Sequence, residues 1–100
     1  MNMTTDQVLD ALSKDDLQYV RAKLDMLIPE AKASLEATVG LPTNITTKQG
    51  STIDLLTDRY IVEYCRAALD GVDNERILLT LQIQIQGVLK TTVQNDDETT

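Results

Sequence analysis

Residues 51–71, STIDLLTDRYIVEYCRAALDG, contain the clearest helix signal in this chain. Ser51 is a typical helix N-cap residue with an acid, Asp54, three positions later, and Gly71 is a typical stop. Apolar residues fill most positions between these two signals. The polar residues are confined to one stripe: Asp54, Thr57, Asp58, Arg59, Glu63, Arg66 and Asp70. A helix that is apolar around most of its circumference is predicted to be the central one.

A second long helix is predicted upstream, over residues 14–39. Apolar residues recur there at steps of three and four for more than twenty positions, which is a strong helix pattern. Ser13 is the expected N-cap, and Asp15 and Asp16 would lie in the first turn, where negative charge is favourable. Gly40 is expected to end the helix. The two long helices are predicted to pack as an antiparallel pair.

Two local features add to the prediction of two long helices. Pro29 lies inside the upstream helix, which predicts a kink near Ile28 or a break into two helices. Thr4 and Gln7 form a capping-box pattern, which predicts a short first helix that stops near Ser13.

The segment between the long helices, residues 41–50 (LPTNITTKQG), is predicted to be a loop. A loop that joins two long helices lies at one tip of the molecule, where contact with partners is common. Its candidate contact residues are Thr43, Asn44, Ile45, Thr46, Thr47 and Lys48.

Residues 77–86, ILLTLQIQIQ, have a different pattern, with apolar residues at every second position. The apolar set is Ile77, Leu79, Leu81, Ile83 and Ile85. A period of two favours a strand. A helix is the alternative, since another set fits steps of three and four: Ile77, Leu78, Leu81, Ile85, Val88 and Leu89.

A single strand in a helical protein would leave its main-chain donors and acceptors without partners. We therefore expect residues 77–90 to leave a helical core of residues 1–76 and to dock on a sister subunit or another protein. Residues 91–100, TTVQNDDETT, are expected to be a disordered acidic tail. The predicted fold class is mainly α: a small helical bundle with a C-terminal extended segment or strand.

Composition argues against several classes of function. The chain of 100 residues has no His and only one cysteine, Cys65, so neither a zinc site nor an activated nucleophile is expected. The glycines are isolated and form no phosphate loop. We expect no catalytic residue, metal or cofactor, and therefore no enzyme; Cys65 is expected to be a small core residue.

Charge and hydropathy also limit the partners. The net charge of −7 disfavours direct nucleic-acid binding. Arg59 and Arg66 share one helix face but are flanked by Asp58 and Glu63, so we expect intrahelical ion pairs there. The beginning of the chain has no signal-peptide pattern. No apolar run approaches the roughly 20 residues that a membrane helix needs, and no membrane association is expected.

The order and spacing of these elements resemble the small head–tail connector (adaptor) proteins of long-tailed bacteriophages. The resemblance covers about residues 13–86 and is carried by these motifs: Asp15-Asp16-Leu17 with the helix ending at Val39-Gly40; Ile53-Asp54-Leu55-Leu56, Arg59-Tyr60 and Glu63-Tyr64-Cys65-Arg66; and residues 75–83, ERILLTLQI. The chain departs from that family in having no Phe or Trp in the central helix.

The resemblance implies a structural virion protein that forms a dodecameric ring between the portal protein and a stopper or tail-completion protein. In that setting we expect residues 77–86 to dock on the portal or a neighbouring subunit, and the loop residues 43–48 are the candidates for contact with the stopper. Genomic DNA would pass through the lumen at the virion head–tail interface, after synthesis in the host cytoplasm. A small acidic regulatory or inhibitor module that binds another protein is the alternative.

Overall fold

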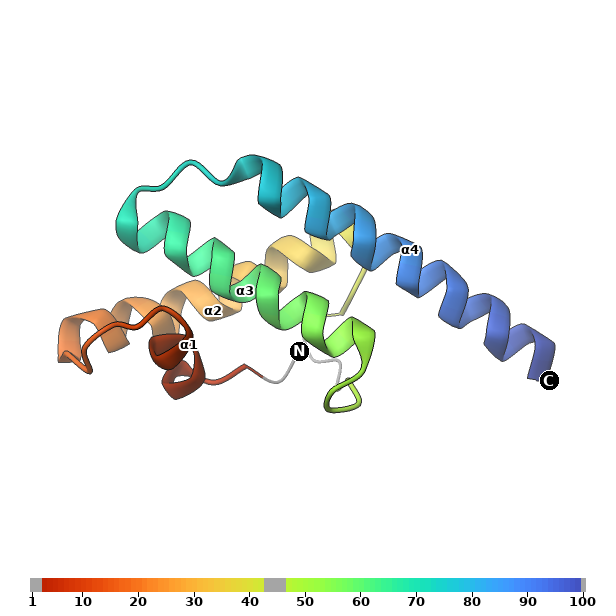
Figure 1. Ribbon diagram of the computed structural model, residues 1–100, viewed down its shortest axis with the longest axis horizontal. Coiled ribbons are helices and arrows are strands. Elements are labelled where there is room, and N and C mark those ends of the chain that lie inside the picture. Colours follow the sequence, from red (N-terminus) through yellow and green to blue (C-terminus); the bar gives the residue numbers. More distant parts are fainter. Residues whose placement is uncertain (1–2, 43–46, 100) are drawn as a thin grey trace.

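The computed structural model describes residues 3–42 and 47–99, the last nine by their backbone. It contains four helices: α1 (Thr5–Ala11), α2 (Gln18–Val39), α3 (Thr52–Asp70) and α4 (Glu75–Thr99). The described residues contain no strand. In Figure 1, α3 runs antiparallel to α2 and to α4, and the C-terminal half of α4 extends past the other helices. The mainly α fold is confirmed. α3 contacts all three other helices, as expected for a central helix, and so does α2.

The helix ends follow from local sequence signals. Thr4 and Gln7 form the expected capping box at the start of α1. The Ser51 hydroxyl accepts a hydrogen bond from the Asp54 backbone N–H at 3.3 Å and caps α3. Gly40 and Gly71 end α2 and α3 in the left-handed region, with φ of 77° and 66°. Side chains are strained in this region, so glycine is the favoured residue at both ends.

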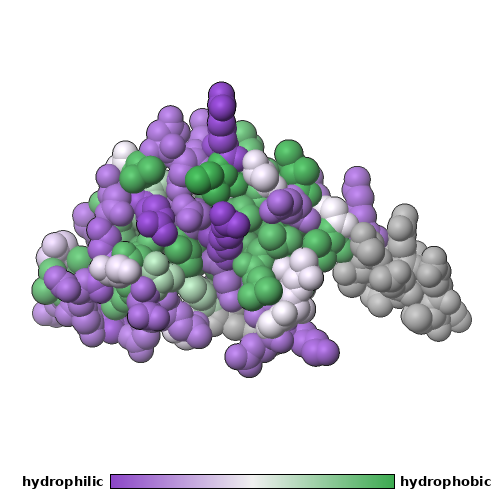
Figure 2. Space-filling view, in the orientation of Figure 1, coloured by the Kyte–Doolittle hydropathy of each residue, from purple (hydrophilic) through white to green (hydrophobic). Residues whose placement is uncertain are grey.

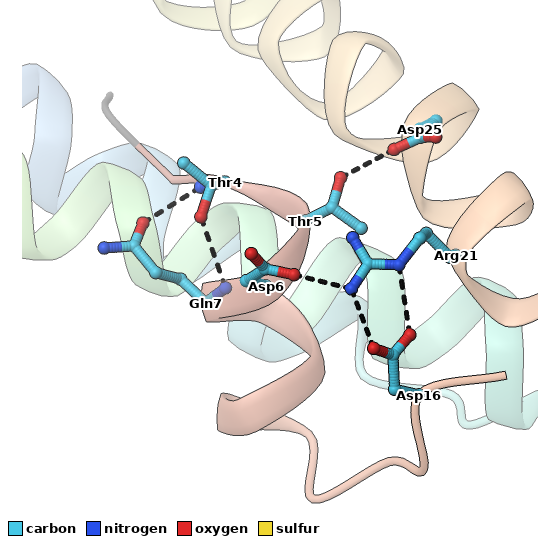
Figure 3. Close-up of polar contacts among 7 residues, drawn as sticks. All are labelled: Thr4, Thr5, Asp6, Gln7, Asp16, Arg21 and Asp25. Atoms are coloured by element: carbon cyan, nitrogen blue, oxygen red, sulfur yellow. Dashed lines mark hydrogen bonds and ion pairs between the residues drawn. The ribbon is translucent and has the colours of Figure 1, made fainter. Parts of the chain in front are cut away.

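The start of α2 differs from the prediction. The helix begins at Gln18, with Leu17 as N-cap, and Ser13 lies outside it with φ of 53°. Asp16 does not sit in the first turn; its carboxylate accepts hydrogen bonds from Arg21 Nε and Nη2 at 3.0 and 3.1 Å. This two-point contact is drawn in Figure 3. The helix continues through Pro29, so the expected alternative of a break into two helices is wrong.

Polar contacts hold α1 against α2. Arg21 also donates from Nη2 to Asp6 Oδ1 on α1 at 2.6 Å, and the Thr5 hydroxyl donates to Asp25 Oδ1 at 2.7 Å (Figure 3). The neighbouring Arg21 guanidinium holds the pKa of Asp16 below its usual value, chiefly through the hydrogen bond. These exposed contacts orient the short helix, whereas burial provides most of its stabilisation.

The buried apolar side chains form two clusters. The first joins α1 to the first part of α2 and the second half of α3: Val8, Leu9, Leu12, Val20, Leu24, Ile28, Ala31, Ile61, Val62 and Cys65. The second joins α2, α3 and α4: Leu35, Leu41, Tyr60, Leu81 and Ile85. α2 and α3 contribute to both clusters, so most of the apolar surface of α3 is covered by the fold, although Leu55 remains 61% exposed.

The strand predicted for residues 77–86 is wrong, because this segment belongs to α4. A helix satisfies its main-chain groups internally, so no sister strand is required. Leu81 and Ile85 lie in the second core cluster, and residues 77–90 therefore pack on the body of the molecule. The backbone of α4 continues through Thr99, across most of the segment expected to lack regular structure.

Candidate docking surface

The helical register of α4 separates the residues predicted to form one docking face. Leu81 and Ile85 are buried, with 2% and 0% of their surface exposed. Leu79 and Ile83 are 49% and 68% exposed, and Ile77 at the edge is 41% exposed. The correction follows from geometry: alternate residues share one face of a strand, whereas successive residues of a helix are rotated by about 100°.

Leu79 and Ile83 form what we call the outer face of α4. They lie four residues apart, so their side chains are neighbours on the helix surface. Figure 2 shows hydrophobic residues among hydrophilic ones on the face of the molecule that is in view. Two large apolar side chains left exposed on one turn form a small apolar surface that a protein partner could cover.

A cleft of about 220 Å³ lies between α3 and α4. We call it the arginine cleft, after the two arginines among its lining residues: Arg59, Arg76, Ile77, Thr80, Leu81 and Gln84. Within the described residues, neither Arg59 nor Arg76 forms an ion pair, whereas Arg21 and Arg66 do. The predicted intrahelical pair is confirmed for Arg66, which lies 3.4 Å from Glu63 Oε2, and is wrong for Arg59.

The turn between α3 and α4 fixes the geometry of this cleft. Asn74 is buried, and its amide donates to the Glu63 carbonyl oxygen at 2.8 Å and to Glu63 Oε2 at 3.1 Å. Glu63 in turn pairs with Arg66. Because Asn74 immediately precedes α4, these contacts hold the start of α4 against the second half of α3.

The structure describes only part of the predicted loop site, residues 43–48. Thr43, Asn44, Ile45 and Thr46 lie outside the described residues. Thr47 is buried, and its hydroxyl donates to Asp54 Oδ1 at 2.6 Å. Lys48 is exposed. Thr47 therefore belongs to the fold, whereas Lys48 is the one described residue of the predicted contact set with an exposed side chain.

Asp54 and Thr57, expected on the polar stripe of α3, are in fact buried. Asp54 accepts from the Thr47 hydroxyl and from the Gly50 backbone N–H, the latter at 3.1 Å. The hydrogen bond from Thr47 is the main reason that the pKa of Asp54 lies below its ordinary 3.8; burial acts in the opposite direction. This carboxylate connects the loop to the first turn of α3.

Cys65 is buried, which confirms the prediction of a core thiol. Burial, followed by the nearby charge of Glu30, raises its pKa to about 11. A thiol with such a pKa is a poor nucleophile at neutral pH. Cys65 therefore stabilises the first core cluster and is not a reactive site.

No family model, curated protein or solved structure matched the chain in three comparisons. Among the described residues, no group of three or more acidic, His or Cys side chains is placed to hold a metal ion. In the same part of the chain, no helix has the length and apolarity needed to cross a membrane. The candidate surfaces for contact with a partner are therefore the outer face of α4 and the arginine cleft.

Three residues of the arginine cleft were missed by sequence reasoning. Arg76, Thr80 and Gln84 are spaced four apart, which places them along one side of a helix. That signal was present in the sequence, but the strand interpretation of residues 77–86 concealed it. The contribution of Arg59 could not be found this way, because it comes from a different helix.

Proposed function

We propose that this chain is a structural adaptor that docks on another protein through the outer face of α4. The observation that carries the proposal is the exposure of Leu79 and Ile83 on one turn of a helix that extends past the rest of the molecule. Burying apolar surface stabilises association by about 25 cal/mol per Å² before the costs of ordering are counted. A small apolar face with polar neighbours is typical of a partner contact.

The resemblance in helix order and spacing gives this adaptor its proposed setting. We propose a ring-shaped head–tail connector of a long-tailed bacteriophage, at the virion head–tail interface, with the portal protein on one side and a stopper or tail-completion protein on the other. In this proposal α4 faces the portal or a neighbouring subunit. Lys48, at the opposite end of α3 from the α3–α4 turn, belongs to the loop that would face the stopper.

The charge of the chain supports this setting. A net charge of −7 would make the lumen of a ring repel phosphate groups. Genomic DNA would then pass through without binding, because tight binding requires a basic surface.

Binding to the portal protein from the same source tests the proposal. Wild type is expected to co-elute with the portal in size-exclusion chromatography and to add a ring to it in electron micrographs. The Leu79→Asp/Ile83→Asp double variant should lose this binding while keeping its helical circular dichroism spectrum. Met26→Asp is the matched control, because Met26 on α2 is as exposed as Ile83, at 67% against 68%.

Absence of wild-type binding to the portal would overturn the connector proposal. Equal loss of binding in the Met26→Asp control would overturn the assignment of the contact to α4. Specific binding of wild type to a different protein, as a monomer, would instead favour an acidic regulatory module.

A further inference from the structure

We infer that the acidic end of α4 in one copy of the chain docks into the arginine cleft of a second copy. The acidic end is defined as residues 93–98, VQNDDE. This inference deepens the oligomeric part of the proposed function and rests on it only for the biological setting of the assembly. It is tested with this chain alone.

The arginine cleft has the chemistry of a site for an anion attached to an apolar group. Arg59 and Arg76 place two positive charges at one cleft, and within the described residues no carboxylate pairs with either. Like charges repel, so a carboxylate bound between them would be stabilised by both. The cleft wall also contains Ile77, which is 41% exposed, beside the buried Leu81.

The acidic end of α4 has the complementary composition. Residues 91–100 contain Asp96, Asp97 and Glu98 and no Lys or Arg. This segment also contains one apolar residue, Val93. Its composition, acids together with an apolar residue, is complementary to that of the cleft, which combines two arginines with an apolar wall.

A second copy is needed because the cleft and the acidic end belong to the same unbroken helix. α4 runs from Glu75 to Thr99, and Gln84 is the last cleft residue on it. Asp96 is twelve positions further on, which corresponds to about 18 Å along the axis at a rise of roughly 1.5 Å per residue. Figure 1 shows this end of α4 leading away from α3. The acidic end therefore cannot contact its own cleft while α4 is intact.

The association would be head to tail. Each copy carries one arginine cleft and one acidic end at separate places, so each can bind a neighbour through either surface. Such a heterologous contact generates a ring if the rotation closes and a filament if it does not. The outer face of α4, Leu79 and Ile83, is separate from this contact and stays available for the portal.

Charge reversal at both surfaces tests the inference. The cleft variant is Arg59→Glu/Arg76→Glu, and the end variant is Asp96→Lys/Asp97→Lys. Sedimentation velocity and mass photometry of the chain alone would measure association at about 50 mM and about 500 mM salt, where the Debye length falls severalfold. Lys23→Glu/Lys32→Glu is the control for net charge, because neither lysine lines the cleft or belongs to the loop at 43–48.

Wild type and the control variant are expected to associate at low salt and to dissociate at high salt. Each reversal variant alone should associate at least about tenfold more weakly, a change of about 1.4 kcal/mol. An equimolar mixture of the two reversal variants should associate again, because every cleft then meets an end of opposite charge. Circular dichroism should be unchanged in both variants.

Two results would overturn the inference: a wild-type chain that stays monomeric at low salt, or reversal variants that associate as wild type does. Loss of portal binding in the cleft variant with normal self-association would also overturn it, because the cleft would then serve the portal. If wild type fails to bind the portal but the mixture of the two reversal variants still associates, the connector proposal is rejected and this inference is kept.

Discussion

The hydroxyl of Tyr60 on α3 lies 2.8 Å from the hydroxyl of Ser34 on α2. Gln82 of α4 donates to the same tyrosine oxygen from Nε2 at 3.2 Å. The Tyr60 side chain is only 1% exposed, so one buried oxygen joins three helices. The hydroxyl is satisfied inside the protein, as a buried polar group must be.

Replacing Tyr60 by Phe removes this oxygen and leaves the ring in place. We expect the free energy of unfolding to fall by about 1 kcal/mol, because the hydroxyl of Ser34 and the amide of Gln82 lose their buried partner. Urea denaturation followed by circular dichroism measures the change. Tyr19→Phe is the control, because Tyr19 is 66% exposed; an equal loss in both variants would contradict the three-helix contact.

The register of α4 predicts opposite results for two neighbouring isoleucines. Ile85 is fully buried, so Ile85→Ala should lower the free energy of unfolding by about 2–5 kcal/mol. Ile83 is 68% exposed, and Ile83→Ala should change it by no more than about 0.5 kcal/mol. Ile83→Asp should likewise keep the isolated chain helical. Global unfolding of the Ile83→Asp variant in circular dichroism would show that the register is wrong.

The lowered pKa of Asp54 predicts that this residue's contribution to stability depends on pH. Its pKa in the folded state is below 3.8, mainly because the Thr47 hydroxyl donates to it. A lowered folded-state pKa means that the stabilisation is complete above 3.8 and is lost as the pH falls through the folded-state value. Asp54→Asn should therefore cost about 1.5–3 kcal/mol at neutral pH and much less under strong acid.

Thermal unfolding of wild type and Asp54→Asn across this pH range measures the effect. Asp10→Asn serves as the control, because Asp10 is exposed. A constant difference in stability between wild type and Asp54→Asn at every pH would contradict the role of the ionised carboxylate.

The buried thiol of Cys65 should report on global unfolding. With 0% of its surface exposed and its pKa raised to about 11, it should react with a disulfide reagent only when the chain opens. We expect the labelling rate at neutral pH to rise with urea in parallel with unfolding. Rapid labelling of the native chain, with an unchanged circular dichroism spectrum, would contradict the packing of the first core cluster.

Features encoded within one helical turn were predictable from the sequence. The Thr4–Gln7 capping box and the Ser51 cap depend on residues three positions apart, and Gly40 and Gly71 stop their helices for local steric reasons. The central place of α3 followed from its wide apolar surface. These features need no knowledge of the tertiary contacts.

Features that depend on contacts beyond one helical turn were not predictable in this way. Asp16 resembles a first-turn acid, but it lies before α2 and accepts a hydrogen bond from Arg21 of that helix. Asp54 looks like a surface residue until Thr47 is placed beside it. In residues 77–86 the apolar residues fit both periods, and packing of Leu81 and Ile85 against Tyr60 selects the helix.

The most direct test of contact between the outer face of α4 and a protein partner is site-specific photo-crosslinking from position 83. A benzophenone amino acid would replace Ile83 in one variant and Met26 on α2 in another, since the two positions are equally exposed. We expect crosslinks from position 83 to the portal protein in the assembled complex and none from position 26. Crosslinks from position 26 alone, in a complex that forms normally, would contradict this expectation.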